Sequence, residues 1–191
     1  MTDPRTRRPG DEFRYRQRYP TEASGSGVCL AVLHNPTGRR RAPGERGRTI
    51  QVCLWFAERH GCGELRTCNL FARKDRPDGV RREPLPDPPD PVEVRRENDR
   101  RIAAEVARAD VVLCAWGDGK RLGTTEERAE EVLALLDRGG AEGRLYALGF
   151  NRSGQPTHPI GGPGRQPLDP GGAFPVRVAG RMLVAVRRRR G

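Results

Sequence analysis

The chain has 191 residues, of which 35% are hydrophobic and 5% aromatic, so it can bury one compact aliphatic core but not two large ones. Its formal net charge of +11 favours an acidic partner, nucleic acid or a nucleotide before a membrane surface. A second explanation stays open, because 34 of the 36 basic residues are arginine and a GC-rich coding genome produces the same bias.

No segment approaches the ~20 apolar residues that a membrane-spanning helix needs, and the first residues lack the hydrophobic middle of a secretory signal. The five cysteines are odd in number and lie mostly in apolar patterns, which is typical of reduced thiols. We therefore expect a cytoplasmic protein without a membrane partner. We also expect a basic disordered N-terminus over 1–12, a single α/β domain over 13–186 and an arginine-rich tail over 187–191. The oligomeric state stays open.

In chain order, hydrophobic periodicity and turn residues predict an alternation of strands and helices. The predicted elements are an edge strand or hairpin arm within 13–20, a strand over 28–33, a helix over 49–61, a strand over 64–72, a helix over 95–109, a strand over 110–116, a helix over 124–138, a strand over 144–150 and a hairpin over 174–186. Prolines rule out regular structure across 76–91.

This alternation predicts a three-layer α/β/α fold built on an open, mainly parallel sheet of about four core strands. Short edge strands would be added near the two ends of the chain. In such sheets ligands bind outside the carboxyl ends of the strands. The residues that follow the four core strands are therefore the candidates for a site.

Polar or aromatic residues follow each of these strands. They are His34, Asn35, Pro36 and Thr37 after the first, Asn69 and Phe71 after the second, Trp116, Gly117 and Asp118 after the third, and Asn151 through His158 after the fourth. We interpret His34, Pro36, Thr37, Asn69, Phe71, Trp116 and Asn151 as candidate substrate-binding residues. Asn35 and His158 are the candidate catalytic residues.

Each of these residues also has a structural explanation. Asn35 offers an amide that donates and accepts hydrogen bonds, yet Asn-Pro also initiates turns. Trp116 either closes the core or stacks on a ligand, and His158 is either a general acid or a packed imidazole.

Thr37 and the three arginines beyond Gly38 are suited to contacting phosphate, because guanidinium groups match phosphate oxygens. Arg39, Arg40, Arg41 and, further on, Arg48 are the candidate phosphate-binding residues. The spacing is not that of a P-loop, no G-x-G-x-x-G follows a strand and no G-x-S-x-G is present, so we expect neither ATP nor a dinucleotide cofactor. The cysteines and histidines match no metal signature, and we expect no metal and no other cofactor.

A succession of motifs resembles the family called domain of unknown function 1643. The motifs are "LHNPTG" (33–38), "TIQVCLWFAERHG" (49–61), "CNLFA" (68–72), "DPVEVRREND" (90–99), "AWGDG" (115–119), "LYALGFNRSGQPTHPI" (145–160) and "QPL" (166–168). They occur in order over about residues 13–170. Where that family typically reads L-N-P-S-T-A, this chain has His34-Asn35-Pro36-Thr37-Gly38-Arg39.

A more distant similarity is to the uracil-DNA glycosylase superfamily. Asn35-Pro36, Asn69, Trp116-Gly117 and His158-Pro159 occur here in the same order as related residues there. The resemblance implies that Asn35 positions the attacking water, Asn69 reads the base edge and His158 stabilises charge on the departing base. It further implies that Trp116 supports the pocket wall, that arginines hold phosphates and that a duplex substrate has its base flipped out.

The resulting hypothesis is a nucleobase-handling, glycosylase-like hydrolase, an N-glycosidase acting on nucleic acid or a nucleoside. Two alternatives stay open at this point. One is a nucleic-acid-binding protein of the same fold without catalysis, and the other is a small-molecule enzyme in which the arginines serve solubility.

Overall fold

The computed structural model describes residues 12–37, 44–74, 90–118, 125–160 and 168–186. Its elements, in chain order, are β1 (Gln17–Pro20), β2 (Gly27–Leu33), α1 (Arg48–Arg59), β3 (Cys62–Asn69), α2 (Val92–Val106), β4 (Val111–Cys114), α3 (Thr125–Arg138), β5 (Leu145–Ala147), the 3₁₀ turn η1 (Pro170–Gly172), β6 (Phe174–Ala179) and β7 (Met182–Ala185). The predicted termini 1–12 and 187–191 lie almost wholly outside these ranges, as do residues 76–89 of the proline-rich segment.

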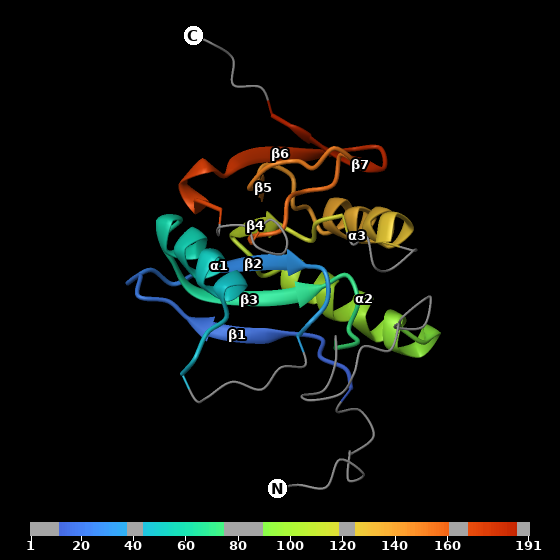
Figure 1. Cartoon of the computed structure of the whole chain (residues 1–191), viewed down its shortest axis with the longest axis horizontal. Helices are drawn as coiled ribbons and strands as arrows, with labels where there is room; N and C mark the ends of the chain where they lie inside the picture. Colours follow the sequence, from blue (N-terminus) through green and yellow to red (C-terminus); the bar gives the residue numbers. More distant parts are fainter. Residues whose placement is uncertain (1–11, 38–43, 75–89, 119–124, 161–167, 187–191) are drawn as a thin grey trace, which may run out of the picture.

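In the described part of the chain the protein is an α/β domain with a seven-stranded sheet in the order β1-β3-β2-β4-β5-β6-β7 (Figure 1). β3, β2, β4 and β5 are parallel neighbours, as predicted. β1 joins β3 antiparallel at one edge, and β6 and β7 form an antiparallel extension at the other.

The sheet is therefore mixed, and the prediction of a mainly parallel sheet holds only for its four central strands. A parallel neighbour requires a long crossover, usually a helix. Between β5 and β6 the described residues contain only η1, so β6 returns antiparallel to β5.

Local signals explain several boundaries. Gly61 follows the last turn of α1 with φ of +68°, a conformation that favours glycine at a helix end. The hairpin of β6 and β7 turns at Gly180, where φ is +62°. α2 begins at Val92, three residues earlier than predicted, because Pro91 takes the N-cap position with extended ψ.

Alternating residues of the central strands contact helices on opposite faces of the sheet. Cys29, Ala31 and Leu33 of β2 lie in one core cluster with the buried side of α1. Leu30 and Val32 of the same strand lie in a second cluster with α2 and α3.

The five cysteines are free and buried within these clusters, and burial raises the pKa of the Cys53 and Cys68 thiols to about 12.

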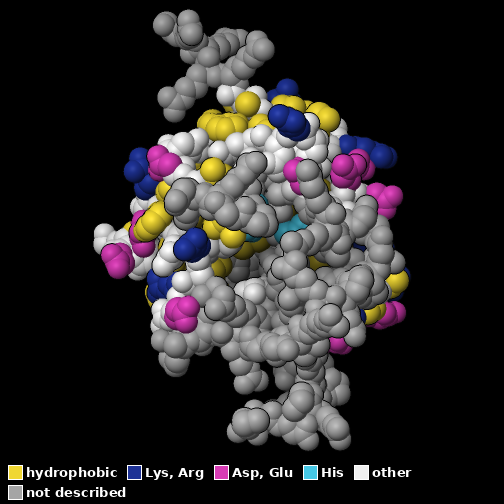
Figure 2. All heavy atoms as spheres, in the orientation of Figure 1, with side chains coloured by type: hydrophobic (Ala, Val, Ile, Leu, Met, Phe, Trp, Pro, Cys, Tyr) yellow, Lys and Arg dark blue, Asp and Glu magenta, His cyan; other side chains and the backbone are white. Residues whose placement is uncertain are grey.

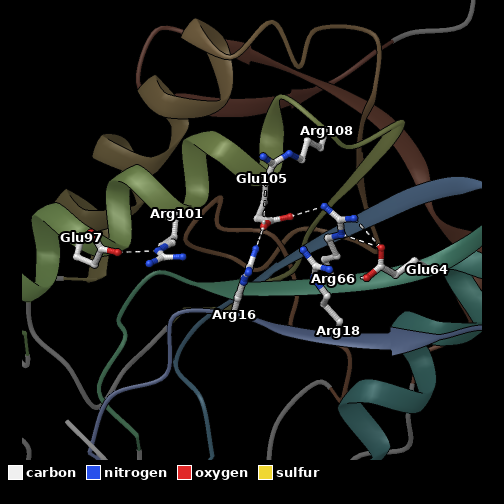
Figure 3. Close-up of polar contacts among 8 residues, drawn as sticks. All are labelled: Arg16, Arg18, Glu64, Arg66, Glu97, Arg101, Glu105 and Arg108. Atoms are coloured by element: carbon white, nitrogen blue, oxygen red, sulfur yellow. Dashed lines mark hydrogen bonds and ion pairs between the residues drawn. The ribbon is translucent and has the colours of Figure 1, made fainter. Parts of the chain in front are cut away.

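A buried ion-pair network connects β1, β3 and α2 (Figure 3). Glu105 of α2 is 1% exposed and accepts hydrogen bonds from Arg66 at 2.8 Å and from Arg16 at 2.6 Å. Arg66 also contacts Glu64 on its own strand, at 2.7 Å. Each charge thus has an opposite charge beside it, which burial at this depth requires.

The positive charge of the chain is unevenly distributed. The described residues hold 20 of the 36 basic and 19 of the 25 acidic side chains, so they are close to neutral. On the face in Figure 2, described basic and acidic side chains are accordingly interspersed.

Within the described ranges, no helix has the length and apolar character required to cross a bilayer.

Candidate functional site

The carboxyl ends of the central strands lie level with one another. Leu33 of β2 is paired with Asn69 of β3, and Val32 with Cys114 of β4. Cys114 is in turn paired with Ala147 of β5. The segments that leave these strands therefore start from one edge of the sheet, which is where the sequence placed the candidate residues.

Pairing continues past the ends of β2 and β3. Leu70 N donates to Leu33 O at 2.8 Å, and Phe71 N donates to His34 O at 3.0 Å. The rings of His34 and Phe71 meet edge to face, with centroids 5.5 Å apart. Phe71 is 3% exposed, so it supports the imidazole from the core.

His34 and Asn35 are joined by their side chains. The imidazole Nδ1 lies 2.9 Å from Asn35 Oδ1, and Nε2 lies 3.2 Å from the hydroxyl oxygen of Thr125, the first residue of α3. Asn35 is partly exposed and Pro36 is buried. The end of β2 is thereby linked to the N-terminus of α3.

His158 reaches the same region from the segment after β5. A bridge between Phe150 and Pro156 folds this segment back, and Gly117 N donates to Pro156 O at 2.9 Å. Gly117 has φ of +76°, and a Cβ at this position would lie 3.1 Å from His158 Cβ. Glycine after Trp116 is therefore required both by the backbone and by the close approach of His158.

His158 is held as a neutral imidazole. Burial, followed by the charge of the nearby His34, lowers the pKa of His158 to about 4. Ile160 N donates to Nδ1 at 3.4 Å, so the proton of the neutral ring is on Nε2. Among the described residues Nε2–H has no acceptor, which leaves a neutral donor for a ligand.

The titration of His158 gives a first prediction. Its folded pKa is below the ordinary value of 6.5, so between these values the unfolded chain binds a proton that the folded protein excludes. Lowering the pH from 7 to 5 should therefore cost about 2 kcal/mol of folding free energy through this residue. NMR titration should give a pKa near 4 for His158, and urea unfolding of His158→Gln should lose this part of the pH dependence. A pKa of 6 or above would contradict the buried, neutral imidazole.

Trp116 is buried, whereas Asn151 is partly exposed in the turn before His158. The Trp116 ring is 1% exposed and its Nε1–H donates to Gln155 Oε1 at 2.7 Å, so it closes the core, and the interpretation of a ring that stacks on a ligand is wrong. The backbone of Asn151 pairs with Gln155 and Gly154 in the turn that precedes His158.

Asn69 is 5% exposed, and among the described residues its side-chain amide makes no hydrogen bond. Its backbone is held firmly. Asn98 of α2 donates to the carbonyl groups of Asn69 and Leu70, both at 3.0 Å, and the buried Arg128 of α3 donates to Leu70 O at 2.8 Å. Two helices thus fix the point where β3 ends.

Asp90 and Asp99 hold the neighbouring segments. The Asp90 carboxylate accepts hydrogen bonds from the backbone of Ala72 and Arg73, at 2.7 and 2.9 Å. Asp99 accepts from Arg128 at 2.6 Å. The motif at 90–99, which the sequence analysis quoted without a role, therefore secures the chain beyond β3.

The candidate phosphate-binding residues are only partly placed. Arg39, Arg40 and Arg41 lie outside the described residues. Arg48 is exposed at the first position of α1, and Thr37 is exposed with its carbonyl accepting from Arg14 at 3.0 Å.

Sequence reasoning missed two residues of this region, Thr125 and Arg128. It included Gln155 only as part of the segment Asn151 through His158 and gave it no role. A buried arginine within a helix motif has no signal of its own, because its partners come from other elements.

Two other features lie away from this edge. An open groove of about 670 Å³ runs between α1 and the turn at η1, lined by Trp55, Glu58, Arg59, Leu168, Asp169 and Pro170. Within the described ranges, no group of three or more His, Cys, Asp or Glu side chains is arranged to hold a metal ion.

Fold and site together define an α/β protein with a cluster of amide and imidazole groups at the carboxyl edge of four parallel strands. The model of the family "Protein of unknown function (DUF1643)" matches residues 14–160, and the chain belongs to that family. Neither a curated protein nor a solved structure matches the chain.

Proposed function

We propose that this protein is a nucleobase-handling, glycosylase-like hydrolase of the uracil-DNA glycosylase type, acting on nucleic acid or on a nucleoside. The observation that carries the proposal is the Asn35 amide held by His34 at one edge of the sheet, with the desolvated, neutral His158 close enough to His34 for the two rings to interact electrostatically. An uncharged N–H donor in a partly buried site stabilises an anion that forms only as the bond breaks. Helices on both faces of the sheet suit the three-layer arrangement of that superfamily.

The proposed reaction is hydrolysis of the N-glycosidic bond. A water molecule that donates a hydrogen bond to the remaining lone pair of Asn35 Oδ1 attacks the sugar carbon and loses a proton to solvent. The carbon–nitrogen bond breaks, and its electron pair leaves with the base. His158 Nε2–H stabilises the resulting anion, which then takes a proton from solvent. Asn69 reads the edge of the base, and Trp116 supports the wall behind it.

The partner is proposed to be nucleic acid or a nucleotide. Because the described residues are nearly neutral, most of the excess positive charge lies in the other segments of the sequence, including Arg39, Arg40 and Arg41. Phosphate contacts by those arginines would make binding fall steeply with salt.

The direct test is base release by the wild-type protein and by Asn35→Ala. Substrates are single-stranded and duplex oligonucleotides and free nucleosides carrying uracil, hypoxanthine or the ordinary bases, with the freed base measured by chromatography. Asn35→Ala should lower the rate of base release by about a hundredfold, because it removes a group that acts on the reacting water. Its affinity for the substrate should change little.

Gln51→Ala serves as the matched control, since it removes an exposed amide from α1. Affinity without base release from any substrate would show a binding protein without catalysis. Base release that is insensitive to salt would identify a nucleoside rather than a polymer as the substrate. Equal rates for Asn35→Ala and wild type would refute the role of Asn35.

A further inference from the structure

We infer that His34 is a positioning residue for Asn35 and that Thr125 holds the other side of its imidazole ring. The inference deepens the proposed function, on which its catalytic consequence rests. It starts from the histidine directly before Asn35-Pro36, whose ring contacts side chains on two sides.

The hydrogen bonds of His34 allow one assignment of the neutral ring. An amide oxygen only accepts, so the contact of 2.9 Å to Asn35 Oδ1 requires a proton on His34 Nδ1. Nε2 then carries the lone pair and accepts from the Thr125 hydroxyl at 3.2 Å. The series runs from the Thr125 hydroxyl through the imidazole to the Asn35 oxygen.

Three elements hold the imidazole in this position. Its own backbone carbonyl accepts from Phe71 N beyond β3, and the Phe71 ring packs edge-on against it. Thr125, at the start of α3, is 2% exposed. An imidazole held on this many sides fixes the amide better than an exposed side chain would, because less rotational freedom is left to the pair.

The consequence is a defined orientation of the Asn35 amide. Its oxygen is turned to His34, and among the described residues its NH₂ group has no partner. An Asn-Pro turn alone would leave the amide free to rotate by half a turn. With His34 in place, the second lone pair of Oδ1, which holds the attacking water in the proposed reaction, and the NH₂ group both keep a fixed direction.

The tautomer gives a test that does not depend on activity. The chain has three histidines, so long-range ¹H–¹⁵N correlation spectra can be assigned by single substitutions. At mildly alkaline pH, His34 should be protonated on Nδ1 in the wild type. In Asn35→Ala it should shift toward the Nε2–H form, because the acceptor at Nδ1 is gone while the Thr125 oxygen can accept instead. An Nε2–H ring in the wild type would overturn the inference.

The effect on Asn35 is tested with graded variants. His34→Phe keeps the ring beside Phe71 but removes both hydrogen bonds, and it should lower kcat for base release about tenfold with little change in KM. His34→Asn, whose amide can donate from the place of Nδ1, should recover part of the rate. Thr125→Val should lower the rate, and Thr125→Ser should restore it.

These outcomes separate the two proposals. If no substrate releases a base, the proposed function fails, while an Nδ1–H ring that depends on Asn35 still supports the positioning of the amide. If bases are released but His34→Phe and Thr125→Val match the wild type, the function stands and the inference is overturned. Thermal unfolding of His34→Phe and Thr125→Val shows whether a lower rate of base release arises from misfolding. A lower rate that arises from misfolding should not recover in His34→Asn, and failure of His34→Asn to recover any rate counts against the inference.

Discussion

Replacing Glu105 by leucine is expected to lower the free energy of unfolding by about 3–5 kcal/mol, the usual effect of breaking a buried ion pair. Glu105 is 1% exposed and pairs with Arg66 of β3 and with Arg16, which directly precedes β1 (Figure 3). Without the carboxylate, the guanidinium of Arg66, whose side chain is 11% exposed, keeps Glu64 as its one acidic partner among the described residues. Urea unfolding followed by circular dichroism measures the difference.

The pH dependence of the same variant provides a second readout. Burial acts to raise the pKa of Glu105, but hydrogen bonds from Arg66 and Arg16 outweigh it and hold that pKa below its usual range. Stability from this group is therefore present above the usual pKa of glutamate and is lost as the pH falls through the folded value. Glu105→Leu should lack this acid-sensitive part.

The matched control is Glu97→Leu. Glu97 is on the same helix, and in the described part of the chain its ion pairs are with Arg100 and Arg101 on the helix surface. Exposed pairs of this kind contribute little, so the control should unfold close to the wild type. Equal destabilisation of both variants would show that α2 responds to any loss of charge and that the network is unimportant.

Arg128→Met is expected to lower the free energy of unfolding by about 1–3 kcal/mol, because the hydrogen bonds of a buried guanidinium are lost while the carboxylates left behind stay partly exposed to water. Arg128 is 2% exposed and donates to Leu70 O, to Asp99 at 2.6 Å and to Glu131 at 2.8 Å. Methionine fills a similar volume but offers no donor, so two carboxylates and one carbonyl lose their contact. Arg128→Lys keeps the positive charge but lacks the planar guanidinium group with its several N–H donors. It should recover only part of the lost free energy of unfolding.

Arg138→Met is the control, because Arg138 is exposed at the end of the same helix. It should change the free energy of unfolding little. Since Arg128 fixes the backbone beside Asn69, Arg128→Met should also increase amide hydrogen exchange at Leu70 and Phe71, whose N–H groups pair with the end of β2. Unchanged exchange at these amides would contradict the role of Arg128 in supporting the site.

Much of the fold follows from local pattern. The apolar runs at 28–33 and 110–116 predict buried parallel strands, and the helical spacing of 49–61 ends at Gly61 as expected. The turn at Gly180 is equally local. These signals are short-range, since they depend on side-chain periodicity and on the backbone freedom of single residues.

Some parts of the site were also predictable. The rule that parallel strands gather their carboxyl ends at one edge was enough to select His34, Asn35, Asn69 and His158. It could not distinguish a residue that faces a ligand from one that faces the core, and so both interpretations of Trp116, core closure and stacking on a ligand, stayed open until its burial was known.

The sequence by itself determined the alternation of strands and helices, the four parallel strands and the edge at which the polar residues gather, because each depends on residues close together in the chain. Only the tertiary structure decided that the sheet is mixed, that Thr125 and Asn35 share one imidazole, that Arg128 and Asn98 fix the end of β3, and that His158 is neutral. Hydrogen bonds and burial of this kind join residues tens of positions apart, and no local periodicity records them. Their free energy depends on distance and desolvation, which exist only once the chain has folded.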